Sequence, residues 1–211
     1  ATRLVDELQT KEDYCLYLGR LSAEKGINTL INAARELTSC RIKIAGSGPQ
    51  EGEIRAAASS MENMDFLGYV SGEQKNEQVA RARALVVPSE WYENFPVSIV
   101  ESMSLGTPVI ASRIGGLPEM VDDGHSGMLF DAGNMSELSA CIDKFCTDLQ
   151  LAVTMGRNAL QYAQDHFALG QHAARLEQIY GTTLENYNKG ISWVDRKYSR
   201  IALCKDSALQ T

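Results

Sequence analysis

The sequence predicts an α/β fold, a doubly wound parallel sheet of about six strands with helices on both faces. Short apolar runs alternate along the chain with longer stretches whose apolar residues recur at helical spacing. The connections between these stretches are short, and several of them are rich in glycine. Regular alternation of this kind is typical of parallel sheets, because each strand has to return through a crossover helix.

Each strand is predicted from an apolar run and each helix from its apolar period. The run 14–18 suits a strand that is buried on both faces, whereas Ile27, Ile31 and Ala34 lie on one face of the helix that follows. The predicted strands are 14–18, 41–45, 65–70, 84–88, 108–112 and 127–130. The predicted helices cover about 27–37, 51–60, 71–82, 96–105 and 117–122, one that begins at Asn134 or Ser136, and roughly 150–165 and 170–188.

The chain is predicted to form one domain over residues 13–189. Residues 1–12 are polar and charged, and we interpret them as a linker leading into that domain. Residues 190–211 carry Trp193, Tyr198 and several charges without a regular period, so we interpret them as a C-terminal tail. The sequence begins at Ala1, in the middle of its pattern, and we therefore expect it to be either a fragment or a processed form of a longer chain.

Composition and charge limit the classes of function. The chain has 211 residues, 44% of them hydrophobic, which is enough for a sizeable core. Its formal net charge of −7 argues against nucleic acid as a partner, because a phosphate backbone is bound by a basic face. No run of about 18 apolar residues occurs, so no membrane-spanning helix is predicted. We expect a cytoplasmic protein, with a peripheral position at the inner membrane surface left open.

The cysteines do not form an even framework. Five are present, at Cys15, Cys40, Cys141, Cys146 and Cys204, and we expect them to be free thiols in a reducing compartment. The three histidines lie in different segments, and no Asp-x-Asp pair occurs, so we expect no metal site.

The stretch 89–106 carries the strongest sign of a ligand site. It follows a predicted strand and contains a helix that Pro96 is expected to open, as its first residue, and Gly106 to close. The free amides at the start of such a helix attract anions, phosphate above all. Glu93 and Glu101 could then sit at opposite ends of a bound diphosphate and accept hydrogen bonds from sugar hydroxyls. Two solvated acids at a helix end remain the structural alternative.

Glycine-rich turns follow several other predicted strands, at Gly19, Gly46, Gly48 and Gly115–Gly116. Ligands of parallel sheets bind beyond the carboxyl ends of the strands, and glycine lets the backbone approach a ligand closely. The dinucleotide fingerprint Gly-x-Gly-x-x-Gly and the phosphate loop of nucleotide triphosphatases are both absent, which argues against a dehydrogenase and against an ATPase of that type.

Four blocks of the sequence recur at the ends of the predicted strands. They are Leu18–Leu21 with Glu24–Gly26, Ile44–Pro49, Phe66–Ser71, and Pro88–Ser112 with Gly115–Glu119. In their order and spacing, these blocks resemble the donor-binding half of glycosyltransferases of the GT-B fold. More narrowly, they are similar to the retaining enzymes of glycosyltransferase family four, once called group one. The resemblance covers about residues 13–180.

The resemblance implies two Rossmann-like domains that face each other across a cleft. This chain would be the C-terminal one, with a nucleotide-sugar-binding domain at 13–189, and the N-terminal domain that holds the acceptor would be missing. The implied donor is a nucleoside diphosphate sugar, UDP- or GDP-linked, with no cofactor. Any contact with a membrane would come through the missing domain.

The resemblance also implies roles for individual residues. Arg20, Lys25 and Glu93 would be catalytic, the two cations by steadying the diphosphate leaving group in place of a metal. Glu93 would bind hydroxyls of the sugar and Glu101 those of the ribose. The implied donor-binding residues are Gly19, Arg20, Lys25, Gly46, Gly48, Val70, Glu93, Asn94, Phe95, Pro96, Val97, Ser98 and Glu101.

The pattern departs from the family at one point and leaves two other functions open. The family often has Gly-Phe-Gly after the first glutamate, whereas this chain has Asn94-Phe95-Pro96, and Pro96 has no amide hydrogen to offer to a phosphate. Each candidate residue taken alone has an ordinary structural explanation, and their joint occurrence at successive strand ends favours binding. A non-catalytic nucleotide-binding or regulatory module and a sugar-nucleotide epimerase of similar fold remain alternatives.

Overall fold

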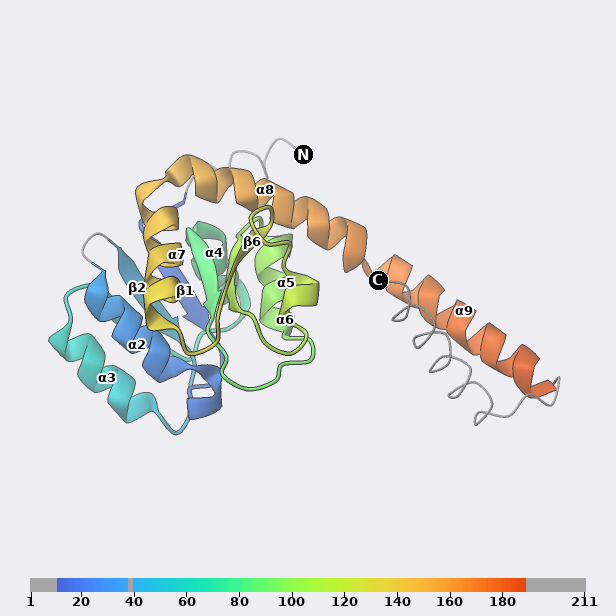
Figure 1. Ribbon diagram of the computed structural model, residues 1–211, viewed down its shortest axis with the longest axis horizontal. Helices are drawn as coiled ribbons and strands as arrows, with labels where there is room; N and C mark the ends of the chain where they lie inside the picture. Colours follow the sequence, from blue (N-terminus) through green and yellow to red (C-terminus); the bar gives the residue numbers. More distant parts are fainter. Residues whose placement is uncertain (1–10, 38–39, 189–211) are drawn as a thin grey trace, which may run out of the picture. The chain divides into compact units, whose positions relative to one another are not determined.

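The computed structural model describes residues 11–37 and 40–188. They form a six-stranded sheet in which every pair of neighbouring strands is parallel, as predicted (Figure 1). The strands are β1 (Tyr14–Leu18), β2 (Arg41–Ala45), β3 (Met64–Gly68), β4 (Ala84–Val87), β5 (Val109–Ser112) and β6 (Gly127–Phe130). Their spatial order is β3-β2-β1-β4-β5-β6, so the direction of winding reverses between β1 and β4.

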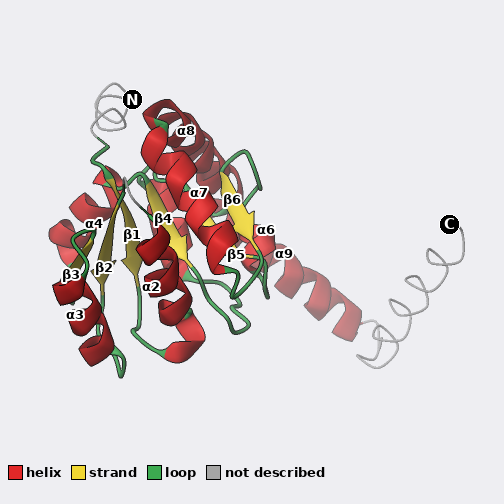
Figure 2. Cartoon of the chain, turned by 60° about the vertical axis from the view of Figure 1, so that its left-hand side comes forward, coloured by secondary structure: helices red, strands yellow, loops and turns green. Residues whose placement is uncertain are grey.

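Helices cover both faces of this sheet. The helical elements of the domain are a 3₁₀ turn (Ala23–Lys25), α2 (Ile27–Glu36), α3 (Glu51–Ser60), α4 (Gly72–Arg81), α5 (Val97–Ser104), α6 (Leu117–Met120), α7 (Met135–Thr147) and α8 (Leu149–His166). Right-handed crossovers place α2 and α3 on one face and α4 and α5 on the other. Figure 2 shows α7 on the same side as α2.

Burial follows the position of each strand in the sheet. β4 and β5 lie inside the sheet and are buried along their whole length, whereas β3 at the edge is largely half-exposed. α2 turns Ile27, Leu30 and Ile31 towards the core, and each such fully buried side chain stabilises the fold by roughly 1.5–3 kcal/mol. The carboxyl ends of the strands lie at one common edge because the sheet is parallel, and the buried core keeps the strands in place.

Glycines let the loops at that edge pack against one another. A side chain at Gly46 would collide with the carbonyl of Gly19, and one at Gly26 would collide with the carbonyl of Pro88. Gly26 also adopts the left-handed conformation, with φ of 69°. These glycines bring neighbouring loops together, whereas the sequence analysis explained Gly46 by close approach to a ligand.

Several boundaries differ from the prediction by one or two residues. β3 ends at Gly68, so Val70 lies in the loop beyond the strand. Pro96 is the residue before the first helical one of α5. Lys11 and Glu12, assigned to the linker, contact the domain, with Lys11 buried and the amide of Glu12 donating to the carbonyl of Arg81. Residues 1–10 and the predicted tail 190–211 lie outside the described residues.

The cysteines overturn part of the prediction. Cys40 and Cys146 are joined by a disulfide, with their Cα atoms 5.6 Å apart, so the expectation of free thiols is wrong for this pair. Cys15 and Cys141 are free, as expected. Burial raises the pKa of the Cys15 thiol to about 12, so this thiol stays protonated and unreactive at ordinary pH. Cys204 lies outside the described residues.

The chain divides into two compact units between His166 and Phe167, and the domain above is the first of them. This boundary is earlier than the predicted domain end at residue 189. The second unit contains α9 (Leu169–Asn188), close to the predicted helix 170–188. Its apolar side chains Ile179, Tyr180, Leu184 and Tyr187 are exposed.

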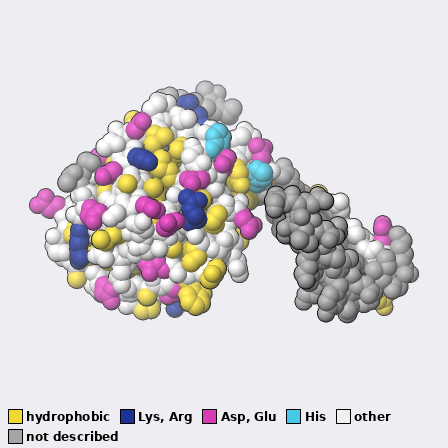
Figure 3. Space-filling view, viewed as in Figure 1, with side chains coloured by type: hydrophobic (Ala, Val, Ile, Leu, Met, Phe, Trp, Pro, Cys, Tyr) yellow, Lys and Arg dark blue, Asp and Glu magenta, His cyan; other side chains and the backbone are white. Residues whose placement is uncertain are grey.

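The surface carries mixed charge. On the face shown in Figure 3, the described Lys and Arg side chains are scattered, with Asp and Glu between them. Among the helices that the structure describes, none combines the length and the apolar character needed to cross a bilayer.

Candidate functional site

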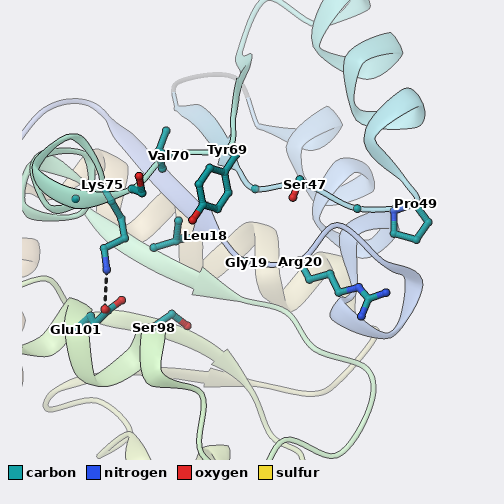
Figure 4. A pocket seen from close by; sticks show the side chains of 14 residues that line it. Leu18, Gly19, Arg20, Ser47, Pro49, Tyr69, Val70, Lys75, Ser98 and Glu101 are labelled. Carbon is teal, nitrogen blue, oxygen red and sulfur yellow. Dashed lines mark hydrogen bonds and ion pairs between the residues drawn. The ribbon is translucent and has the colours of Figure 1, made fainter.

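Two adjoining pockets open at the carboxyl edge of the sheet. Pocket A, of about 660 Å³, is lined by Leu18, Gly19, Arg20, Gly46, Ser47, Gly48, Pro49, Tyr69, Val70, Ser71, Gly72, Lys75, Ser98 and Glu101 (Figure 4). Pocket B, of about 470 Å³, is lined by Tyr17, Leu18, Gly19, Arg20, Glu24, Lys25, Val86, Val87, Ser89, Glu93, Pro96 and Ser98. Pocket B lies where the winding reverses, between the loops after β1 and β4, which is the usual ligand position in open parallel sheets.

The two pockets share a wall formed by four residues, Leu18, Gly19, Arg20 and Ser98. Arg20 and Gly19 come from the loop after β1, and Ser98 comes from the first turn of α5. The first amides of a helix have no acceptor within it, so the start of α5 brings free N–H groups to this wall. A cation and a helix start therefore lie where one pocket passes into the other.

Arg20 presents an unpaired guanidinium to both pockets. Its side chain is exposed and makes no ion pair with any residue that the structure describes. The backbone of Arg20 is held in place by Tyr17, whose hydroxyl donates to the Arg20 carbonyl at 2.6 Å. Burial, together with the charges of Glu93 and Glu24, raises the pKa of Tyr17, so the phenol remains a neutral donor.

Lys25 and Glu93 form an ion pair across pocket B. Lys25 Nζ contacts Glu93 Oε1, and the side chains are 30% and 16% exposed. The Ser89 hydroxyl donates to the same carboxylate oxygen at 2.8 Å. Ser89 is itself held by the Ser112 hydroxyl, which donates to its carbonyl at 2.6 Å. One oxygen of Glu93 is therefore occupied by protein donors, and the other remains for a ligand.

The turn Gly115–Gly116 supports the backbone of Glu93. The Gly116 amide donates to the Glu93 carbonyl at 2.7 Å. A Cβ atom at Gly115 would lie 2.6 Å from that carbonyl oxygen, and one at Gly116 would collide with the carbonyl of Asn94. The sequence analysis identified this turn, and the structure shows that it packs under the glutamate.

Glu101 is paired in the same manner in pocket A. Lys75 Nζ lies 2.6 Å from Glu101 Oε1, and the side chains are 22% and 38% exposed. Lys75 comes from the first turns of α4 and Glu101 from α5, so the pair joins two helices along the pocket (Figure 4).

The structure brings most of the predicted site residues together. Ten line one or both pockets: Gly19, Arg20, Lys25, Gly46, Gly48, Val70, Glu93, Pro96, Ser98 and Glu101. The other three, Asn94, Phe95 and Val97, are exposed and line neither pocket. Whether any of these residues binds a donor stays a prediction.

Among the lining residues that were not predicted, Tyr69, Lys75 and Ser89 carry polar groups at the pockets. Tyr69 is 75% exposed and directly follows β3, a position after a parallel strand that could have suggested it. Ser89 lies two residues beyond the end of β4, at the same edge of the sheet. Lys75 lies inside a helix, and nothing in its local sequence indicates that it faces Glu101.

Among the described residues, the side chains that lie close enough together to share a metal ion are not in the pockets. The group whose ligand atoms lie close enough to share an ion is Cys15, Cys40 and Cys146, in the core, and two of these cysteines form the disulfide.

Comparison with known proteins gives a family match over most of the chain. The family model "Glycosyl transferases group 1" matches residues 3–162. Alpha-D-kanosaminyltransferase from Streptomyces kanamyceticus is 28% identical over 172 residues, 78% of this chain and 44% of that protein. D-inositol 3-phosphate glycosyltransferase from Mycobacterium sp. (strain KMS) is 28% identical over 208 residues, 95% of this chain and 46% of that protein. The chain thus spans about half the length of these relatives.

Solved structures share the fold. Sucrose-phosphate synthase from Thermosynechococcus elongatus matches with a TM-score of 0.74 and 28% identity, over 88% of this chain and 49% of that one. HepE from Anabaena, solved in complex with UDP, matches with a TM-score of 0.74 and 23% identity, over 86% of this chain and 53% of that one. The C-terminal domain of a group 1 protein from Francisella tularensis has a TM-score of 0.63 at 17% identity, with 92% of that domain covered.

Proposed function

The chain belongs to the group 1 glycosyl transferases, and we propose that it is the donor-binding half of a retaining, metal-independent member. In this proposal it binds a nucleoside diphosphate sugar, UDP- or GDP-linked, and a domain outside this sequence holds the acceptor. The relatives are about twice as long as the matched region, which supports a second domain. This chain alone is then expected to transfer little or no sugar.

One observation carries the proposal, the two pockets that meet at Arg20. A nucleoside diphosphate sugar has two hydroxyl-rich ends joined by a dianionic centre. Pocket A offers Glu101 and pocket B offers Glu93 as acceptors for hydroxyls, and the shared wall offers Arg20 and the start of α5 for phosphate. We assign the nucleoside to pocket A and the sugar to pocket B.

The same groups would act on the reaction. When the bond between the anomeric carbon and the phosphate oxygen breaks, negative charge grows on the diphosphate and positive charge grows on the sugar ring. Arg20 and Lys25 would stabilise the departing diphosphate, which lowers the barrier because their attraction strengthens as the charge develops. Glu93 already accepts hydrogen bonds from Lys25 and Ser89. We therefore assign Glu93 to holding sugar hydroxyls, and we assign no covalent nucleophile.

Calorimetric titration of this chain with UDP, GDP and ADP tests the proposal. We expect one of the three to bind without added divalent metal and in the presence of a chelator. Binding of none of them at millimolar concentration would contradict the proposal. Release of free nucleoside diphosphate together with an altered sugar from the matching nucleotide sugar, with no acceptor added, would instead indicate an epimerase-type reaction.

Gly116→Ala is expected to weaken the binding of the nucleotide sugar about tenfold, because the new methyl group displaces the Asn94 carbonyl and shifts Glu93. The affinity for the nucleoside diphosphate alone should change less, since that part of the ligand lies in pocket A and at the shared wall and does not reach the sugar end at Glu93. Calorimetry with both ligands measures the difference.

Gly52→Ala is the matched control, because a Cβ atom there meets nothing within 4 Å. Equal loss of affinity for both ligands in Gly116→Ala would show that the turn does not act through the sugar end.

A further inference from the structure

We infer that Lys75 is a positioning residue that holds Glu101 for recognition of the ribose hydroxyls, an inference that rests on the proposed function. Nothing in the sequence motifs marks Lys75, whereas its contact with Glu101 and its place in pocket A support this role.

The contact is a direct one between side chains of two helices. Lys75 Nζ donates to Glu101 Oε1 at 2.6 Å, across a sequence separation of 26 residues. Both side chains line pocket A, and Figure 4 shows the pair on one side of it and the Arg20 guanidinium on the other. The pair therefore lies at a distance from the cation that we assign to the diphosphate.

The chemistry of the pair suits a hydroxyl better than a phosphate. Glu101 Oε1 accepts from Lys75, which leaves Oε2 for a ligand donor. Lys75 has three N–H donors and spends one of them on Glu101 among the residues described. A hydroxyl both donates and accepts, so a vicinal diol can donate to Oε2 and accept from the ammonium group. A phosphate would meet the Glu101 carboxylate and be repelled.

Holding Glu101 in place matters because a free carboxylate side chain at the pocket wall would lose rotamer freedom on binding. That ordering weakens binding, because immobilising a side chain that has many rotamers costs conformational entropy. An ion pair formed before the ligand arrives removes most of this cost. Lys75 therefore acts on ribose through Glu101, and its effect should disappear with a ligand that has no ribose hydroxyls.

The test uses whichever of UDP, GDP and ADP binds this chain best, together with its 2′,3′-dideoxy analogue. We expect Lys75→Met to lower the affinity for the ribonucleotide about 5- to 10-fold and to leave the affinity for the dideoxy analogue within about twofold. Glu101→Gln should show the same pattern. The double variant should lose little more than either single variant, since the two residues act as one unit.

Two further variants serve as references. Lys75→Arg should restore most of the affinity, because the cation is kept, and Lys144→Met replaces an exposed lysine on α7 and should have no effect. If Lys75→Met lowers the affinity for both ligands equally, Lys75 acts on the phosphates or on the stability of the fold, and the inference is overturned. An unchanged affinity for both ligands would overturn it as well. If wild-type protein binds no nucleoside diphosphate, the proposed function fails and takes this inference with it.

Discussion

Arg20→Ala should lower the affinity of this chain for its nucleoside diphosphate about 10- to 100-fold, because charge-assisted hydrogen bonds contribute roughly 1.5–3 kcal/mol. The loss of affinity should be confined to ligands that carry phosphate groups. Affinity for the corresponding nucleoside, measured by NMR titration, should stay unchanged, since the nucleoside carries no phosphate for Arg20 to bind.

The structure makes this variant easy to interpret. Arg20 is exposed and has no ion-pair partner among the described residues, so its removal leaves no buried charge behind. Arg20→Lys should recover part of the affinity, because a point charge replaces the guanidinium fork. Arg35→Ala, an exposed arginine on α2, is the matched control. If Arg20→Ala binds the diphosphate as tightly as wild type, the shared wall is not the phosphate site.

Lys25 should behave differently from Arg20, although both were predicted for the same role. Lys25 is already paired with Glu93, so a phosphate would have to share its ammonium group with that carboxylate. The sequence placed both cations in one loop but gave no sign of this difference. Only the fold shows that the loop after β1 brings Lys25 against the loop after β4.

The fold was largely readable from the sequence, because apolar runs and helical periods are local properties. The strands, most helices and the edge of the sheet that carries the pockets follow from alternation of short elements. What a local pattern cannot show is which distant residues meet. The Cys40–Cys146 disulfide joins residues 106 positions apart. The Lys75–Glu101 pair joins α4 and α5, which β4 separates in the sequence.

Glycines illustrate the same limit. Their positions after strands correctly indicated the edge of the sheet at which the two pockets open. Their packing partners were not predictable, because Gly46 meets Gly19 and Gly116 meets Asn94 only in the folded chain. A polar leading segment likewise gave no reason to expect that Lys11 would be buried.

The stability of the fold should rise between pH 7 and pH 9 because of Lys11. This side chain is 8% exposed and donates to the Ala80 carbonyl at 2.8 Å and to the Thr107 hydroxyl at 2.6 Å. Burial lowers its pKa from 10.5 to about 7. Between these two values the unfolded chain binds a proton that the folded chain does not, so raising the pH favours the folded state.

The expected size follows from the two pKa values. From pH 7 to pH 9 the free energy of unfolding should rise by about 2 kcal/mol because of Lys11. Below about pH 7 the destabilising contribution of Lys11 should be constant, because this side chain is then protonated in both the folded and the unfolded chain. Lys11→Met removes the proton site, so the variant should lack this gain. Urea unfolding of both proteins at several pH values measures the difference in slope.

Other buried groups do not disturb the comparison. Burial raises the pKa values of Cys15, Tyr14 and Tyr17, which lowers stability only as the pH rises beyond about 9, and it does so in both proteins alike. Lys144→Met, which replaces an exposed lysine, should keep the wild-type slope. If the free energy of unfolding changes with pH in the same way in wild type and in Lys11→Met, Lys11 keeps its proton in the folded chain. Its burial would then make no pH-dependent contribution to stability.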